Sequence, residues 1–436
     1  MTSKRHPRFN LLARALAAAL LASLAALATA ATASIPGLPA EDAALAAIDQ
    51  DPVLLQARHA LQAARHGAAM QRQGSYEWTL GSTVQRRRSD GSPSQREWSA
   101  QLERTVRIGG KAELDRRLGD SSEALAQSQL AIAHSEAALR LLEGWLDWRG
   151  AQLGERLLAE QLQLAEQNLR AVALRHKAGD AARLELRLAE SDVSEMRRQQ
   201  GLAQAATARA EAALRHRYPG LALPAELPAA LAAEPSADPA LPVELGPVSV
   251  AADGHPRLAA AAQSLELARL AAQRVRADRV PDPTIGVFSA SEAGGSERVT
   301  GISLSIPLSG RYREQASRQA LQQLEMAQAA FEQQRRELEL QLNLLTQEVS
   351  GSAARWQQAS GTAQALREIA ALTQKAYAAG EADVHALLLA RRQALEALST
   401  AQAARLDALR AQARLLVETG RLWGWGADGA PIARTE

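Results

Sequence analysis

The chain has 436 residues, of which 47% are apolar and only 3% aromatic, and its formal net charge is +2. A chain so poor in Phe and Tyr has little material for a bulky globular core, and its many Ala and Leu residues favour long helices packed through small side chains. The absence of cysteine excludes disulfides, thiolate metal sites and a lipid-modified N-terminal cysteine.

Segment 1–30 has the composition of a secretory signal peptide. A basic stretch precedes an apolar run over 15–28, and small residues offer cleavage after residue 30 or residue 33. The alternative is a membrane anchor, but the run is shorter than the about 20 residues that a helical span needs. Removing the four basic residues lowers the net charge from +2 to −2, which gives nucleic-acid binding little support. These residues are Lys4, Arg5, Arg8 and Arg14.

The sequence of the first half of the mature chain predicts a helix, then a β-hairpin and then a helical hairpin. Apolar residues recur at helical spacing over 41–73, where Asp51-Pro52 also has the form of a helix start. Alternating apolar and polar residues predict a β-hairpin over 76–108. The proline-free tract 112–217 predicts a long helical hairpin that turns at Gly179.

A proline-rich connector over 218–247 separates this half from a second one with the same plan. The second half predicts a helix over 248–280, a β-hairpin over 283–308 and a helical hairpin over 311–422 that turns at Gly380. A C-terminal tail covers 423–436.

Landmarks of the two halves match at a spacing of about 200 residues. The matched landmarks are Pro52 and Pro256, Lys111 and Arg311, and Gly179 and Gly380. We interpret the chain as a tandem duplication. A seven-residue apolar period in the long helices predicts coiled coils, and their Gln, Glu and Arg residues leave a second face wet, so such helices can wall a water-filled tube.

The two hairpins supply four strands, which are too few to close a barrel within one chain. In the last strand Ile302, Leu304 and Ile306 share one face by the two-residue period of a strand. These residues therefore need a cover that comes from elsewhere in the chain or from outside it.

Several motifs together resemble the TolC-type outer-membrane efflux proteins, over nearly all of the mature sequence. They are the duplicated plan, Pro-Asp-Pro-Thr-Ile-Gly over 281–286, Leu-Ser-Ile-Pro-Leu over 304–308, and Ala-Gly-Glu over 379–381 followed by 387–393. The last stretch is most similar to the subgroup that serves cation-efflux pumps of the cobalt-zinc-cadmium type. One departure is that many relatives carry an acylated cysteine after the signal.

The resemblance implies a mainly α fold with a β-barrel part. Three identical chains would pool twelve strands into one outer-membrane barrel and their long helices into a periplasmic coiled-coil tunnel. Such a homotrimer would be a passive exit duct for metal cations or small toxic compounds, and it would work with a periplasmic adaptor and an inner-membrane pump. It would lie in the cell outer membrane with a periplasmic helical extension.

The same resemblance makes the β-hairpins over 76–108 and 283–308 transmembrane and assigns roles to their residues. Ile302, Leu304 and Ile306 would face lipid, and three aromatic residues would lie at a membrane interface, where such rings are favoured. These aromatic residues are Tyr76, Trp78 and Trp98. The alternative is a small soluble sheet packed on the helices.

The resemblance also implies that the helical turns, Gly179 and Gly380, gather at the periplasmic tip, where acidic residues are candidates for an aperture that concentrates cations. The candidates are Asp180, Glu381 and Asp383. N-capping of the returning helices is the alternative role for these residues. Exposed basic residues at the same tip are candidates for adaptor contact: Arg175, Lys177 and Arg183.

No phosphate-binding loop, metalloprotease motif or nucleophile motif occurs in the sequence, so we expect neither an enzyme nor a cofactor. His59 and His66 share a helix face, but we interpret them as solvated surface residues and not as a metal site. A soluble periplasmic coiled-coil adaptor or scaffold without a pore is the alternative function.

Overall fold

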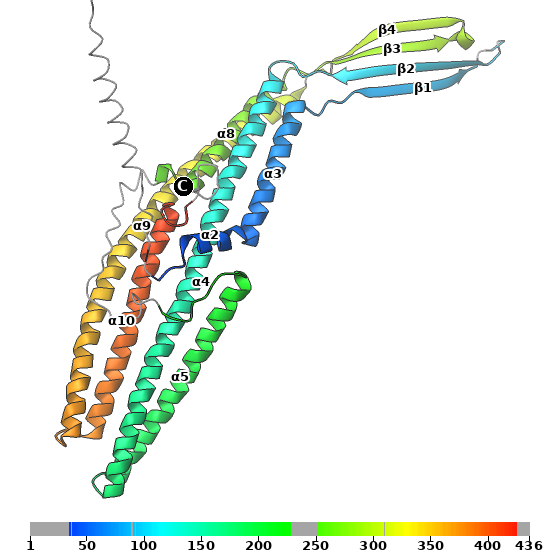
Figure 1. Cartoon of the computed structure of the whole chain (residues 1–436). Coiled ribbons are helices and arrows are strands. Elements are labelled where there is room, and N and C mark those ends of the chain that lie inside the picture. The colour runs from blue at the N-terminus through cyan, green and yellow to red at the C-terminus, as the bar shows by residue number, and fades with distance from the viewer. Residues whose placement is uncertain are drawn as a thin grey trace, which may run out of the picture.

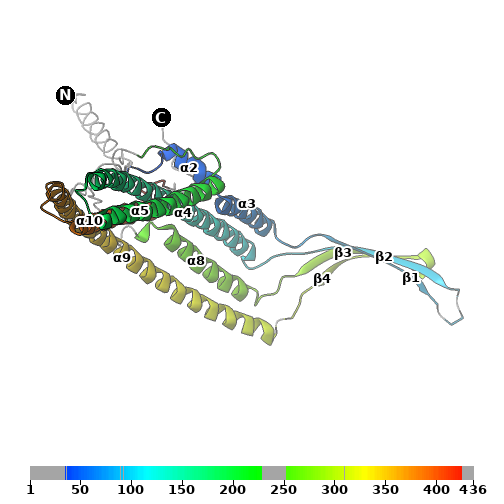
Figure 2. The ribbon, with the colours of Figure 1, turned by 90° about the horizontal axis from the view of Figure 1, so that it is seen from below.

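The computed structural model describes residues 35–227 and 252–424, apart from residues 36, 89, 92 and 309. An elongated body of long helices carries a four-stranded antiparallel sheet at one end (Figure 1). Seen from a second direction, the sheet again projects away from the helices (Figure 2). The signal peptide, most of the connector and most of the tail lie outside the described residues.

The long helices form two matched sets. The first set is α3 (Pro52–Gln73), α4 (Lys111–Ala178) and α5 (Arg183–Arg217), and the second is α8 (Pro256–Ala277), α9 (Arg311–Ala378) and α10 (Val384–Glu418). Corresponding helices have equal lengths of 22, 68 and 35 residues. Equal lengths in the same order confirm the tandem repeat.

The expectation of one helix over 41–73 is wrong, because α2 (Glu41–Asp49) and α3 are separate helices. Between them Asp51 has an extended backbone, with φ −63° and ψ 125°, and its carboxylate accepts a hydrogen bond from the Val53 N–H at 2.9 Å. Pro52 has no N–H with which to continue a preceding helix. The Asp-Pro pair therefore ends one helix and begins the next.

The main core lies halfway along the helical body, where α2 and the ends of α5 and α10 meet α4. The rings of Trp145 and Trp148 pack edge to face, with their centroids 5.1 Å apart, and the Arg149 guanidinium lies 4.3 Å from the Trp148 centroid. Three of the seven tryptophans, Trp145, Trp148 and Trp423, thus lie in this core.

His134 lies in this region on α4 and is 1% exposed, and neither of its ring nitrogens has a hydrogen-bond partner in the described part of the chain. Burial lowers the pKa of His134. The unfolded chain, with an ordinary histidine pKa of about 6.5, therefore binds the proton first as the pH falls. The free energy of unfolding that buried, neutral His134 permits above pH ~6.5 therefore decreases as the pH falls below that value.

We expect His134→Leu to lose less thermal stability than the unsubstituted protein between pH 7.5 and pH 5. Melting temperatures of the purified protein at the two pH values measure this difference. His59→Leu is the matched control, because His59 is exposed on α3. An equal acid sensitivity of all three proteins would contradict the assignment to His134.

The sheet joins strands from both repeats. Its order is β1 (Thr79–Arg87), β2 (Gln95–Thr105), β3 (Thr284–Glu292) and β4 (Glu297–Ser305), with every neighbouring pair antiparallel. The two hairpins are thus fused through β2 and β3. Strands β1 and β4 are the edges, and their outer backbone groups have no partner strand in the described sheet.

None of the described helices is both long enough and apolar enough to cross a membrane.

Candidate functional site

The strand register divides the sheet into two chemically different faces. Cross-strand partners share a face, and one row of partners contains a large apolar side chain from each strand. This row is Leu80, Leu102, Val287 and Ile302. All four are exposed, Ile302 to 84%. We call this side of the sheet the apolar face.

The opposite side, which we call the polar face, holds all the acidic residues of the four strands. These are Glu97, Glu103, Glu292 and Glu297. The carboxylate of Glu97 accepts a hydrogen bond from Gln85 at 2.9 Å and lies 3.1 Å from the Arg87 guanidinium. The sheet thus has the alternation of a wall with an apolar medium on one side and water on the other.

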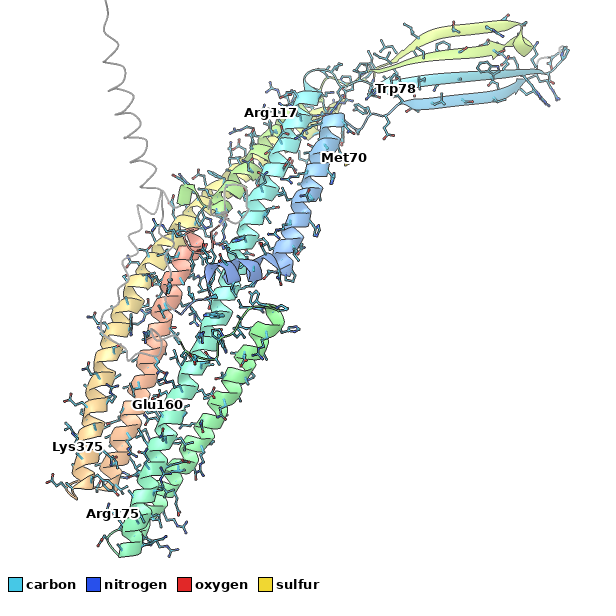
Figure 3. All side chains as sticks on the ribbon, in the orientation of Figure 1. Met70, Trp78, Arg117, Glu160, Arg175 and Lys375 are labelled. Carbon is cyan, nitrogen blue, oxygen red and sulfur yellow. The ribbon has the colours of Figure 1, made fainter. Side chains whose placement is uncertain are left out.

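The structure places two of the three predicted lipid-facing residues, Leu304 and Ile302, on the apolar face. Ile306 follows β4 and is 52% exposed. Monomeric soluble proteins rarely leave so large an apolar surface open. The described helices do not cover this face, because the sheet projects beyond them (Figure 3).

The three predicted interface aromatic residues have different environments. Trp78 lies at the helical end of the sheet (Figure 3), where the Arg104 guanidinium is 5.6 Å from its ring centroid. Trp98 is exposed on the apolar face of β2. Tyr76 differs from the expectation: it is half-buried, and its hydroxyl donates a hydrogen bond to Asp282 at 3.2 Å. Tyr76 therefore serves the junction between sheet and helices.

Sequence reasoning missed this junction, which is built around the ion pair Lys111–Asp282. The two charged atoms are 2.8 Å apart, and the Lys111 side chain is 1% exposed and that of Asp282 5%. Lys111 also donates to the Val280 carbonyl at 2.7 Å, and the backbone N–H of Ile108 donates to Asp282 at 3.0 Å. Burial acts to raise the pKa of Asp282, but the hydrogen bonds from Lys111 and Ile108 outweigh it and lower this pKa.

A second set of ion pairs surrounds the first and holds the helix ends together. Arg107 binds Asp115 at 2.8 Å and donates to three carbonyls at the end of α3. Arg274 of α8 binds the same Asp115 at 2.5 Å. Both β-hairpins are therefore anchored to α3, α4 and α8 through charged side chains.

The two helical turns have the same backbone design. The N–H of Asp180 donates to the Arg175 carbonyl at 2.8 Å, and the N–H of Glu381 donates to the Ala376 carbonyl at 2.9 Å. The residue before each of these donors is a glycine with positive φ, Gly179 at +86° and Gly380 at +79°, a region of backbone conformation that favours glycine. The two pairs of helices end at these turns, near the labelled Arg175 and Lys375 (Figure 3).

The three acidic candidates at the turns are exposed, but only one of them caps a helix. The Asp383 carboxylate accepts a hydrogen bond from the Ala386 N–H at 2.7 Å. The alternative prediction that Asp180 caps the returning helix is wrong, because the N-cap of α5 is Ala182. Asp180 and Glu381 are thus exposed acids without a capping role.

Arg175 links the two helical pairs and is not freely exposed. It donates hydrogen bonds to the Tyr377 hydroxyl at 3.1 Å and to the Asp180 carbonyl at 3.2 Å. The Tyr377 hydroxyl in turn donates to Glu185 at 3.3 Å, and burial and this carboxylate raise the pKa of Tyr377. Lys177 and Arg183 are exposed at the same tip.

His59 and His66 are both exposed on α3. No group of three or more potential metal-ligating His, Cys, Asp or Glu residues occurs in the part of the chain that the structure describes.

Comparison with known proteins gives the geometry a context. Residues 248–421 match the family model described as "Outer membrane efflux protein". A comparison with curated protein sequences found no match.

Solved structures share the fold over most of their length. A membrane protein from Pseudomonas aeruginosa has a TM-score of 0.73 at 17% identity, with 92% of this chain and 93% of that chain covered. The MtrE outer membrane channel of Neisseria gonorrhoeae has a TM-score of 0.70 at 18% identity, with 90% of this chain and 89% of that chain covered. The outer membrane protein VceC of Vibrio cholerae has a TM-score of 0.69 at 15% identity, with 87% of this chain and 95% of that chain covered.

Proposed function

We propose that the chain belongs to the outer membrane efflux protein family, whose model matches residues 248–421, and that it forms the exit duct of a tripartite efflux system. The duct is a passive channel from the periplasm to the exterior and not an enzyme. It lies in the outer membrane with its helices in the periplasm, and it works with a periplasmic adaptor and an inner-membrane pump.

The observation that carries this proposal is the sheet, which has one exposed apolar face and two open edges. Unpaired backbone groups at a strand edge are costly in lipid, so β1 of one chain pairs with β4 of the next. Three chains then close a twelve-stranded barrel, with the apolar faces outward and the polar faces lining the lumen.

Membrane fractionation distinguishes the proposed channel from the alternative, a soluble periplasmic adaptor. The comparisons with known proteins do not favour this alternative. The channel requires detergent for extraction, then has the mass of three chains and conducts ions in planar bilayers. A monomeric protein recovered in the soluble periplasmic fraction would contradict it.

We place the helical turns at the periplasmic entrance, where Asp180, Glu381 and Asp383 of three chains form a ring of negative charge. The support for this assignment is that all three are exposed near the free ends of the helices (Figure 3). Such a ring concentrates cations at a constriction.

Neutralising the ring without removing the helix cap is expected to lower the cation preference of the channel. The variant Asp180→Asn/Glu381→Gln/Asp383→Asn suits this purpose, because Asn caps a helix about as well as Asp. Reversal potentials in a salt gradient measure the preference. Asp383→Ala is the matched control for capping, and it is expected to cost about 1 kcal/mol of stability. An unchanged reversal potential would leave these acids without a role in selectivity.

We propose Lys177 and Arg183 as the adaptor contacts, because both side chains are exposed, whereas Arg175 is engaged by Tyr377 and by the backbone of Asp180. Their test is cross-linking from each position to the adaptor. Substitution of Arg175 instead loosens the link between the two helical pairs.

The exported substrates are metal cations or small toxic compounds. Support comes from the similarity of 379–393 to the cobalt-zinc-cadmium subgroup and from the acidic entrance. Deletion of the gene separates the two classes of substrate. Sensitivity to zinc, cadmium or cobalt alone indicates cations, and sensitivity to hydrophobic drugs alone indicates the other class.

A further inference from the structure

Three arginines occupy the apolar face at the end of the sheet farthest from the helices. Arg86 of β1 is the direct cross-strand partner of Arg96 on β2, and Arg298 of β4 is the partner of Ser291. All three side chains are exposed, and none has an ion pair or hydrogen bond within the described part of the chain. We call Arg86, Arg96 and Arg298 the outer arginine patch.

Among the described residues of the four strands, none supplies a counter-charge on this face. Every acidic residue of the strands lies on the polar face, where Glu97 is already paired with Arg87. Like charges directly opposite each other destabilise a sheet. The pair Arg86–Arg96 therefore favours an anion that comes from outside the chain.

The position of the patch identifies the source of this anion. Along β2, the apolar face runs from Arg104 at the helical end to Arg96 at the outer end, which is eight residues or about 27 Å at ~3.4 Å per residue. Between them lie Leu102, Ala100 and Trp98, in that order. An apolar band bordered by a tryptophan and then by an arginine matches the passage from lipid tails to headgroups.

We propose that the outer arginine patch binds the phosphate groups of phosphorylated lipids in the outer leaflet. A guanidinium makes two parallel charge-assisted hydrogen bonds to a phosphate, and this geometry suits arginine better than lysine. Three chains present nine such arginines around the barrel. The inference rests on the proposed channel function, which places this end of the sheet at the outer surface.

Binding of lipid A to the full-length protein in neutral detergent tests the inference. Lipid A with both phosphates is compared with fully dephosphorylated lipid A that has the same acyl chains, by native mass spectrometry. We expect the unsubstituted protein to prefer the phosphorylated form by about tenfold or more at low salt. We expect Arg86→Gln/Arg96→Gln/Arg298→Gln to reduce this preference to less than about threefold.

A matched control removes three arginines from the exposed helix surface. Arg187, Arg198 and Arg335 each pair only with an acid three residues away in sequence, so their replacement by Gln lowers the net charge equally at little structural cost. We expect this control to keep the preference of the unsubstituted protein. If the control lost the preference as the patch variant did, net charge and not the patch would explain binding.

The single variant Arg96→Gln gives a readout that a folding defect cannot imitate. Relief of the repulsion from Arg86 raises the melting temperature in phosphate-free detergent, and loss of a phosphate ligand lowers it in phosphorylated lipid A relative to the unsubstituted protein. A shift of the same sign in both media would contradict the inference.

Two results overturn the inference outright: no preference in the unsubstituted protein, or a full preference in the patch variant. Conductance in bilayers of phosphatidylcholine and in bilayers that contain lipid A separates this failure from that of the channel function. A protein that conducts in both but binds the two forms of lipid A equally is a channel without the lipid site. A protein that conducts in neither contradicts the channel itself.

Discussion

Ile302→Arg is expected to prevent stable insertion of the protein into membranes. Ile302 lies on the apolar face, level with Leu102 and one row from Arg104, and is 84% exposed. An arginine costs about 2–4 kcal/mol per chain at the bilayer midplane and less toward the interfaces, so three chains lose up to about 6–12 kcal/mol. Denaturant titration of the protein folded into phosphatidylcholine vesicles measures the loss.

The neighbouring substitution Ser303→Arg is the matched control, because Ser303 lies on the polar face and is also exposed. We expect this variant to insert and to assemble, since its guanidinium reaches water in the lumen. If both variants inserted equally well, the apolar face would not be a lipid surface.

Lys111→Met is expected to loosen the junction between the sheet and the helices. It leaves the Asp282 carboxylate buried without its cation, and breaking a buried ion pair from one side typically costs about 3–5 kcal/mol. We expect a lower melting temperature and a lower yield of assembled protein. Lys177→Met removes an exposed lysine and is expected to change neither quantity.

A double-mutant cycle with Asp282→Leu separates the pair from its surroundings. If the pair is coupled, Lys111→Met/Asp282→Leu is less destabilised than the sum of the two single variants. Strict additivity would show that Lys111 acts through its other partners, the Val280 carbonyl and the Asp278 carboxylate at 3.3 Å.

Much of the fold could be predicted because its signals are local. The glycines at 179 and 380 mark turns that need positive φ, and the alternation at 302–306 marks a strand with one apolar face. The break between α2 and α3 was also visible in Asp51-Pro52, but helical periodicity continues on both sides and concealed it.

The rest depends on contacts between distant residues that no local pattern encodes. Lys111 and Asp282 are isolated charges in the sequence, and they meet only because β2 pairs with β3. The same pairing brings Tyr76 to Asp282, so that an aromatic residue expected at the lipid interface serves the junction. Asp180 precedes α5 by three residues, and sequence alone did not show that Ala182 takes the capping position.

Disulfide cross-linking between β1 and β4 tests most directly whether several chains close one wall. The chain has no cysteine of its own, so a pair such as Thr83→Cys and Val299→Cys, both on the polar face and scanned along both strands, reports without background. The intramolecular pair Ser99→Cys/Ala290→Cys, which are register partners in β2 and β3, is the positive control. We predict that oxidation of membranes yields covalent species with the mass of two and three chains. If the control pair closed while every β1–β4 pair gave single chains only, the shared barrel would be contradicted.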